Sequence, residues 1–171
     1  MDHNNASDSS VSRVESLQEQ LFRHREDVRR GGGTIILIGI ATFINIALAY
    51  FEVDLFFPIG LYYPIAVVDL WPSLSGLVVT TVVCALLYLM LGRMARGGSQ
   101  VACNVALILY GIDTVIPLVY TDWIGVGLHA FFLFSMFGAR GKIELVKDTE
   151  ELLQRQEVPA PEPTETAVPG T

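Results

Sequence analysis

Hydrophobic residues gather into four long runs along this chain, separated by short polar or glycine-rich breaks. The runs cover residues 34–53, 74–91, 101–120 and 123–139. An α-helix needs about 20 mostly apolar residues to cross the roughly 30 Å hydrocarbon core of a bilayer, so each run fits one crossing. The pattern predicts an all-α integral membrane protein built as a four-span helical bundle.

A fifth and shorter hydrophobic run covers residues 55–70 and is interrupted by Pro58 and Pro64. Proline removes a backbone hydrogen bond from a helix. Irregular backbone at membrane depth is tolerated where protein or water satisfies its polar groups. We therefore expect a re-entrant or interfacial segment here. If the segment crosses the membrane instead, the bundle has five spans.

A polar segment, residues 1–33, precedes the first span. It contains a stripe of residues at alternating three- and four-residue spacings: Val14, Leu17, Leu21, His24 and Val28. That spacing is typical of a short amphipathic helix lying at the membrane or on neighbouring loops, and also of a dimer seam. Gly31, Gly32 and Gly33 follow, and we expect them to end this helix before the first span begins.

A second polar flank, residues 143–171, follows a transmembrane domain that covers residues 34–142. The last helix is expected to continue into this flank as an amphipathic extension through Ile143, Val146 and Leu153. The end of the chain is rich in proline and glutamate, a composition that buries too little apolar surface to fold. We therefore expect a disordered tail after the helix.

The overall composition also indicates a membrane protein. Hydrophobic residues make up 51% of the 171 residues and charged residues only 17%, against about 25% charged residues in a soluble domain. An ordinary soluble enzyme is therefore excluded, and the lipid bilayer is the first expected partner. The net charge of −7 argues against nucleic-acid binding, which needs a basic surface.

Basic residues next to the spans predict their orientation, because cytoplasmic loops are enriched in lysine and arginine. They form three clusters: Arg29 with Arg30, Arg93 with Arg96, and Arg140 with Lys142. The other connections carry acidic residues, including Asp54 and Asp122. Between Asp54 and Arg93 the chain must cross an odd number of times, which favours one crossing by residues 74–91 and none by residues 55–70. Four spans then place both termini in the cytoplasm.

Three polar residues inside the predicted spans form a candidate cluster: Asn45, Asp113 and His129. Asp113 lies eight residues before Thr121, in the turn between the last two spans, and His129 lies eight residues after it. Antiparallel helices rise equally, so both side chains lie about 12 Å below the turn, where they can pair. Asn45 lies at a similar depth in the first span, although its depth does not fix the direction in which it faces.

Such a cluster has two interpretations. Buried polar residues often hold membrane helices together, whereas an ionisable pair in a membrane is by default a candidate functional site. An intramembrane serine hydrolase using Ser75 and His129 is disfavoured, because Ser75 begins a span and no G-x-S-G motif is present. The histidines and cysteines give no haem-ligand pair and no zinc spacing. We expect no catalytic residue, no metal and no cofactor.

Aromatic residues near the span ends are expected to anchor the bundle at the membrane surface. Trp71 and Trp123 are the strongest candidates, and the tyrosines of the same region are assigned to the same belt: Tyr62, Tyr63 and Tyr120. Asp122 comes directly before the last span, where a carboxylate caps a helix and interacts favourably with its dipole.

Four short motifs carry a resemblance to other proteins: Phe57-Pro58-Ile59-Gly60-Leu61 with Asp69, Leu109-Tyr110-Gly111-Ile112-Asp113, Asp122-Trp123-Ile124-Gly125 and Gly127-Leu128-His129. With these motifs, residues 57–138 resemble a group of small uncharacterised bacterial multi-pass membrane proteins. The resemblance implies a bacterial inner membrane and draws attention to Asp113 and His129. It implies no activity.

Ala41, Asn45 and Ala49 form a small-polar-small stripe that is typical of a helix contact. Together with the polar flanks, this stripe favours a non-enzymatic protein that acts by assembling with itself or with a membrane protein partner. The alternative is a small oligomeric transporter or a proton-linked sensor built on Asp113, His129 and Asn45. A dry and rigid cluster favours assembly, whereas a water-accessible cluster favours transport.

Overall fold

The structure is a computed structural model that describes residues 3–51, 59–64 and 74–157. Its helices are, in chain order, α1 (His3–Tyr50), α3 (Leu74–Arg96), α4 (Gln100–Asp113), α5 (Val115–Val119) and α6 (Trp123–Glu157). Four stretches within them are long and apolar enough to cross a membrane, and α4 with α5 makes one of the four. The chain is therefore an all-α membrane protein with a four-span bundle, as the hydrophobic runs predict.

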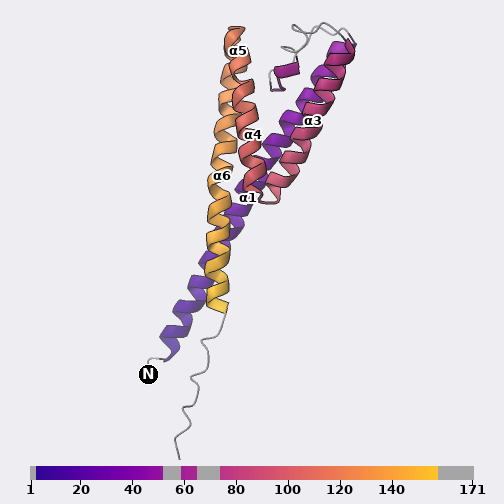
Figure 1. Cartoon of the computed structure of the whole chain (residues 1–171). Helices are drawn as coiled ribbons and strands as arrows, with labels where there is room; N and C mark the ends of the chain where they lie inside the picture. The colour runs from indigo at the N-terminus through magenta and orange to yellow at the C-terminus, as the bar shows by residue number, and fades with distance from the viewer. Residues whose placement is uncertain (1–2, 52–58, 65–73, 158–171) are drawn as a thin grey trace, which may run out of the picture.

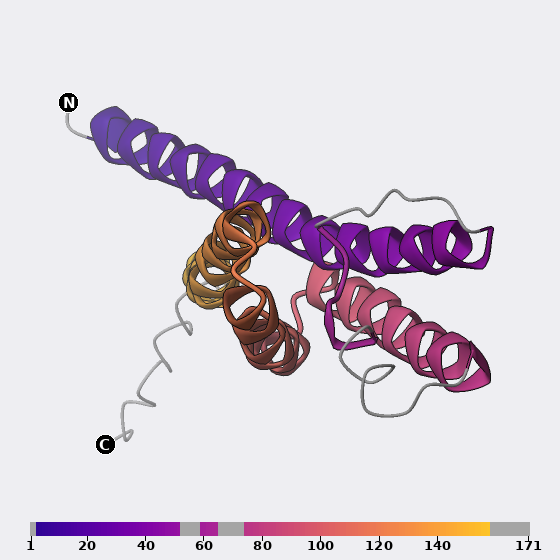
Figure 2. The same ribbon diagram turned by 90° about the horizontal axis from the view of Figure 1, so that it is seen from above.

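The spans form two groups of antiparallel helices. The two groups meet at one end and spread apart at the other (Figure 1). One group contains α1 and α3, and the other contains α4, α5 and α6. Helix α1 also packs against α6, and Figure 2 shows the two helices side by side near the middle of α1. The bundle is thus a wedge with α1 and α6 in contact at its narrow end.

Residues 59–64 lie between the two groups at the wide end of the wedge (Figure 1). We call these six residues the inserted loop. Four of them, Gly60, Leu61, Tyr62 and Pro64, are buried, so this part of the predicted re-entrant segment packs inside the bundle. The rest of that segment lies outside the described residues.

Helix α1 passes through Gly31, Gly32 and Gly33 without a break, so the prediction that these glycines end a helix was wrong. Two of them are sites of close helix contact. A Cβ at Gly31 would overlap the Cβ of Ala139 on α6, and a Cβ at Gly32 would lie 2.6 Å from the backbone nitrogen of Arg96 on α3. This close packing offsets the roughly 1 kcal/mol that each glycine costs in a helix relative to alanine.

A heptad seam joins α1 to α6. Its buried members alternate at three- and four-residue spacings on both helices: Val28, Gly31, Ile35, Ile38 and Thr42 on α1, and His129, Phe132, Met136, Ala139 and Ile143 on α6. Such spacing places these residues on one face of each helix, and the two faces meet where Gly31 contacts Ala139. The α6 face therefore runs from His129, deep in the bundle, to the narrow end of the wedge.

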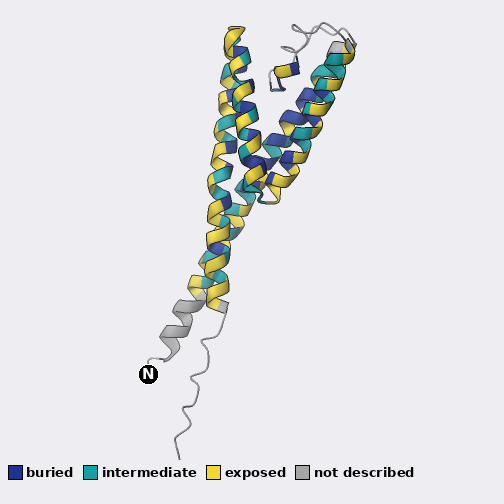
Figure 3. Cartoon of the chain, in the orientation of Figure 1, coloured by how far each residue is buried: buried dark blue, intermediate teal, exposed yellow. Residues whose placement is uncertain are grey.

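The same seam continues beyond the bundle as a two-helix stalk, residues 12–30 of α1 and 140–157 of α6. An ion pair between Arg25 and Glu150 at 2.6 Å joins the two helices there. Most seam residues of the stalk are only half-buried, and Figure 3 shows mainly exposed and intermediate positions along it. Helix α6 continues through the stalk to Glu157, whereas the Pro-rich tail lies outside the described residues.

Basic residues gather where the bundle meets the stalk. The contacts of Gly32 with Arg96 and of Gly31 with Ala139 bring α1, α3 and α6 together at this point. Each of the three predicted basic clusters contains one of these contact residues or lies next to one in the sequence. The clusters are Arg29 with Arg30, Arg93 with Arg96, and Arg140 with Lys142. We call this region the basic end, and we call the opposite end, which contains the turn before α6, the turn end.

Candidate functional site

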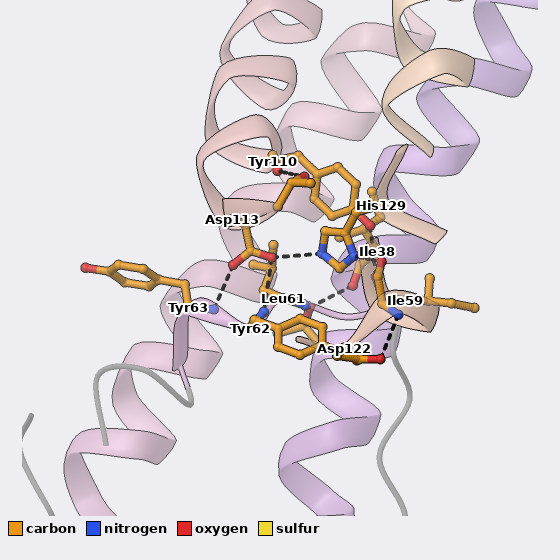
Figure 4. A network of polar contacts seen from close by, with 12 residues as sticks. Ile38, Ile59, Leu61, Tyr62, Tyr63, Tyr110, Asp113, Asp122 and His129 are labelled. Atoms are coloured by element: carbon orange, nitrogen blue, oxygen red, sulfur yellow. Dashed lines mark hydrogen bonds and ion pairs between the residues drawn. The ribbon is translucent and has the colours of Figure 1, made fainter. Parts of the chain in front are cut away.

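Asp113 and His129 lie in direct contact between α4 and α6 (Figure 4). The Nε2 atom of His129 is 3.1 Å from the Oδ2 atom of Asp113, and the two side chains are 0% and 3% exposed. Helix α4 ends at Asp113, four residues before Pro117, which has no N–H to continue the helix. The structure places the two side chains together, as their matched depths predict.

The second ring nitrogen of His129 fixes where its proton lies. The Nδ1 atom is 2.9 Å from the carbonyl oxygen of Gly125, and a carbonyl oxygen only accepts hydrogen bonds. Nδ1 therefore donates, and Nε2 shares one further proton with the carboxyl of Asp113. The pair is either imidazolium with carboxylate or imidazole with carboxylic acid. Both forms have no net charge, which reduces the cost of burying the pair in a membrane.

The carboxyl of Asp113 also holds the inserted loop. Its Oδ2 accepts a hydrogen bond from the backbone N–H of Tyr62 at 3.1 Å, and its Oδ1 accepts one from the N–H of Tyr63 at 2.7 Å. The preceding N–H, that of Leu61, donates to Oγ1 of Thr42 on α1 at 3.0 Å. Irregular backbone in a membrane needs such partners, so side chains from two spans satisfy three consecutive N–H groups of the loop.

Two tyrosine rings enclose the imidazole of His129. The ring of Tyr110 stacks on it with centroids 4.5 Å apart and an interplanar angle of 10°. The ring of Tyr62 meets it edge-on at 5.4 Å. The hydroxyl of Tyr110 donates to the carbonyl of Ile59 in the loop at 3.4 Å. Tyr62 is only 6% exposed, so its assignment to the membrane-surface belt was wrong.

Asp122 connects the cluster to the turn end. Its Oδ1 accepts a hydrogen bond from the backbone N–H of Gly125 at 3.0 Å, which confirms the predicted cap of α6. Its other oxygen accepts the hydroxyl proton of Tyr62. The backbone N–H of Gly125, followed by the Tyr62 hydroxyl, lowers the pKa of the Asp122 carboxyl below its usual value. Gly125 is confined between these groups, since a Cβ there would lie 2.6 Å from the Tyr62 oxygen.

Asn45 lies next to the inserted loop that this cluster holds. A Cβ at Gly60 would lie 2.5 Å from the side-chain nitrogen of Asn45 and 3.2 Å from the backbone of Ala41. The stripe of Ala41 and Asn45 therefore packs against the inserted loop of the same chain. The prediction that this stripe contacts another helix stays a prediction, and the surroundings of Ala49 lie outside the described part.

A cavity of about 350 Å³ lies between α3, α4 and the inserted loop, and Asp113 is part of its lining. Apart from Asp113, its lining consists of leucine, isoleucine, cysteine and tyrosine side chains. Water needs two to four polar partners to occupy a cavity, and apolar cavities stay dry. This lining therefore favours a dry environment around the pair.

Three members of the site were missed by the sequence analysis: Thr42, Tyr110 and Gly125. A signal existed for Tyr110 and Gly125, because each lies one helical turn from a predicted site residue, Asp113 or His129. No signal existed for Thr42, since its role depends on a loop that is close only in the folded chain. Trp123 is 71% exposed at the start of α6, whereas Trp71 lies outside the described residues.

Cysteine and metal chemistry do not extend the site. Cys84 and Cys103 are free thiols. Within residues 3–51, 59–64 and 74–157, no group of three or more histidine, cysteine, aspartate or glutamate residues is placed to hold a metal ion.

Comparisons of the chain with protein-family models, with curated proteins and with solved structures found no match. The resemblance of residues 57–138 to small bacterial multi-pass membrane proteins therefore stays a prediction.

Proposed function

We propose that this chain is a non-enzymatic membrane protein that acts by assembling with a second copy of itself through the outer face of α6. One observation carries the proposal, a second heptad stripe on α6 that faces away from α1. Its apolar members are Phe134, Gly138, Gly141, Leu145 and Leu152, with Asp148 at the position between the two leucines, and all of them are exposed. A partner helix placed along this stripe would bury the apolar positions from Phe134 to Leu145.

The two glycines of this stripe support a helix contact. A Cβ at Gly138 or Gly141 would have no atom within 4 Å. At Gly31 and Gly32 on α1, the space where a Cβ would lie is already occupied by neighbouring helices. A glycine inside a helix costs stability, and small residues let membrane helices approach closely. Approach of a partner helix would give Gly138 and Gly141 the packing that their own chain does not supply.

The leucines of the stripe lie beyond the membrane domain. Leu145 and Leu152 are 42% and 49% exposed in the stalk, where acyl chains do not cover them. Burying them against a partner removes apolar surface from water. This is a second reason to place the contact on the outer face of α6.

The polar cluster supports a structural role within such a protein. Both ring nitrogens of His129 have partners, so neither is available to activate a nucleophile such as Ser75. The apolar lining of the neighbouring cavity disfavours a water path for transport. In this proposal, Asp113 and His129 hold the inserted loop in place.

We further propose a bacterial inner membrane, with the basic end and both termini in the cytoplasm. The support for this orientation is the gathering of the arginines and lysines beside the span ends at the basic end, because cytoplasmic loops are enriched in these residues. The bacterial inner membrane is supported by the resemblance of residues 57–138 alone.

The test is self-association of the purified protein in liposomes, measured by energy transfer between labelled copies. We expect Leu152→Glu to reduce transfer, because a charge on the outer stripe opposes contact. Phe22→Glu is the matched control, since Phe22 is a 72% exposed apolar residue on α1 of the same stalk. Absence of transfer in the wild type, or equal transfer in both variants, would refute assembly through α6.

A proton-linked sensor is the second candidate. It is favoured by the single proton shared by Asp113 and His129, and by the uninterrupted path of α6 from His129 to Glu157. Spin labels on the two stalk helices would show a distance that changes with pH. Asp113→Asn would abolish the change, and a constant distance in the wild type would exclude the sensor.

A further inference from the structure

Two adjoining hollows open at the basic end of the bundle. The larger, about 490 Å³, lies between α1, the connection from α3 to α4, and α6. The smaller, about 380 Å³, lies beside it between α1 and α3. Arg29, Arg96 and Gly97 line both hollows, so the two adjoin, and we call them together the depression.

Cationic side chains dominate the lining. Arg25 and Lys147 join Arg29 and Arg96 in the larger hollow, and Arg93 joins them in the smaller one. The one carboxylate in either lining is that of Glu150, and Arg25 already binds it at 2.6 Å. In the part of the chain that the structure describes, the other four cations have no ion pair. The depression therefore has an excess of uncompensated positive charge.

The orientation of the spans does not by itself explain this convergence. Basic residues that set topology need only lie near the ends of spans on one side of the membrane. Here cations from α1, α3 and α6 face the same hollow. Close packing produces the arrangement, because Gly32 lets α1 approach the backbone of Arg96, and Gly92 lets α3 approach the backbone of Ile36.

Apolar side chains lie directly beside the cations. Ile36 lines the smaller hollow, and Val28, Ile143 and Val146 line the larger one. The hollows are found where the apolar run of α3 ends, at Arg93 and Arg96. A ligand that fits both surfaces has an anionic group in the headgroup region and a hydrocarbon part extending into the bilayer.

We propose that this depression binds the phosphate of an anionic phospholipid, held by Arg29, Arg93 and Arg96, with the acyl chains lying against Ile36. Arginine presents a planar fork of donors that matches phosphate oxygens. Basic pockets between membrane helices at the headgroup level bind anionic lipid headgroups. The lipid would join α1 and α3 at the point where the stalk leaves the bundle.

The test is a binding titration of the full-length protein in detergent. The probe is phosphatidylglycerol labelled on an acyl chain, and phosphatidylcholine with the same label is the reference lipid. We expect Arg29→Gln with Arg96→Gln to weaken phosphatidylglycerol binding roughly 30-fold, since each basic residue contributes about 1 kcal/mol at an anionic surface.

Arg30→Gln with Lys142→Gln is the matched control. It removes the same charge at the same end of the bundle from residues that line neither hollow, and we expect less than about a threefold change. Equal losses in the two double variants, or equal binding of both lipids by the wild type, would overturn the proposal.

Inorganic phosphate distinguishes a lipid headgroup from a soluble ligand. We expect roughly 10 mM phosphate to leave the labelled phosphatidylglycerol bound, because free phosphate lacks the apolar contacts. Displacement by phosphate would show that the site serves a soluble anion and would overturn the lipid assignment. If the glutamine variant does not fold, Arg29→Lys with Arg96→Lys keeps both charges but removes the forks. Unchanged affinity in that variant would overturn the proposed arginine contacts.

Discussion

The carboxyl of Asp113 takes part in three hydrogen bonds, and they hold two different parts of the fold. Two of them hold the inserted loop through its backbone, and the third holds His129 on α6. His129 in turn donates a hydrogen bond to the carbonyl of Gly125. The backbone N–H of Gly125 donates to the carboxylate of Asp122, which caps α6. A single buried side chain thus links α4, the loop and the start of α6.

Removing either partner of the pair should destabilise the protein. We expect Asp113→Asn and His129→Gln each to lower the free energy of unfolding by about 3 kcal/mol, because the remaining partner is left buried without compensation. The double variant should lose little more than either single variant, since the pair acts as one unit. Unfolding in detergent or lipid measures all four proteins.

The opposite result would change the role assigned to the pair. A neutral or stabilising Asp113→Asn would show that the carboxyl costs the fold stability, as functional groups often do. The proton-linked sensor would then become the better proposal.

Glycines in one helix differ in what they contribute to the fold. Gly32 is covered by the backbone of Arg96, whereas a Cβ at its neighbour Gly33 would have no atom within 4 Å. We expect Gly32→Ala to destabilise the bundle by about 1–3 kcal/mol, because backbone atoms must move apart.

Gly33→Ala is the internal control for this prediction. We expect it to be neutral or to stabilise the protein by about 0.5–1 kcal/mol through improved helix propensity. Thermal unfolding of the two variants compares them directly. Equal effects at the two positions would contradict the close approach of α1 and α3.

The helices could be predicted from the sequence where the pattern of neighbouring residues alone determines them. Span length and apolar composition predict the four spans, and equal rise from the Thr121 turn predicts that Asp113 meets His129. The glycines at residues 31–33 misled the prediction, because a local rule cannot distinguish a helix end from a close contact with α3 and α6. Thr42 could not be predicted, since its partner, the N–H of Leu61, is remote in sequence and belongs to an irregular loop.

We expect the basic end to set the orientation of the whole molecule in the membrane. If this end faces the cytoplasm, as we propose, Arg93→Glu with Arg96→Glu should disturb the topology. Two of the residues that keep the loop between α3 and α4 on the cytoplasmic side would then be acidic. Labelling of a cysteine introduced near the C-terminus, from either side of the membrane, measures the outcome.

Arg13→Glu with Arg155→Glu provides the comparison for this experiment. The charge change is the same, but both residues lie in the stalk, away from the span ends. An unchanged location of the C-terminus in the Arg93/Arg96 variant would contradict the role of these residues in setting topology.

The unbroken passage of α1 through its three glycines has a mechanical consequence. Residues 12–31 form a rigid arm of about 28 Å, at 1.5 Å per residue, that is continuous with the part of α1 holding Thr42. A tilt of roughly 10° inside the bilayer would displace the tip of this arm by about 5 Å, since no joint at the membrane surface absorbs the rotation. Any event that widens or narrows the wedge around the inserted loop by tilting α1 would therefore cause a larger displacement at the far end of the stalk.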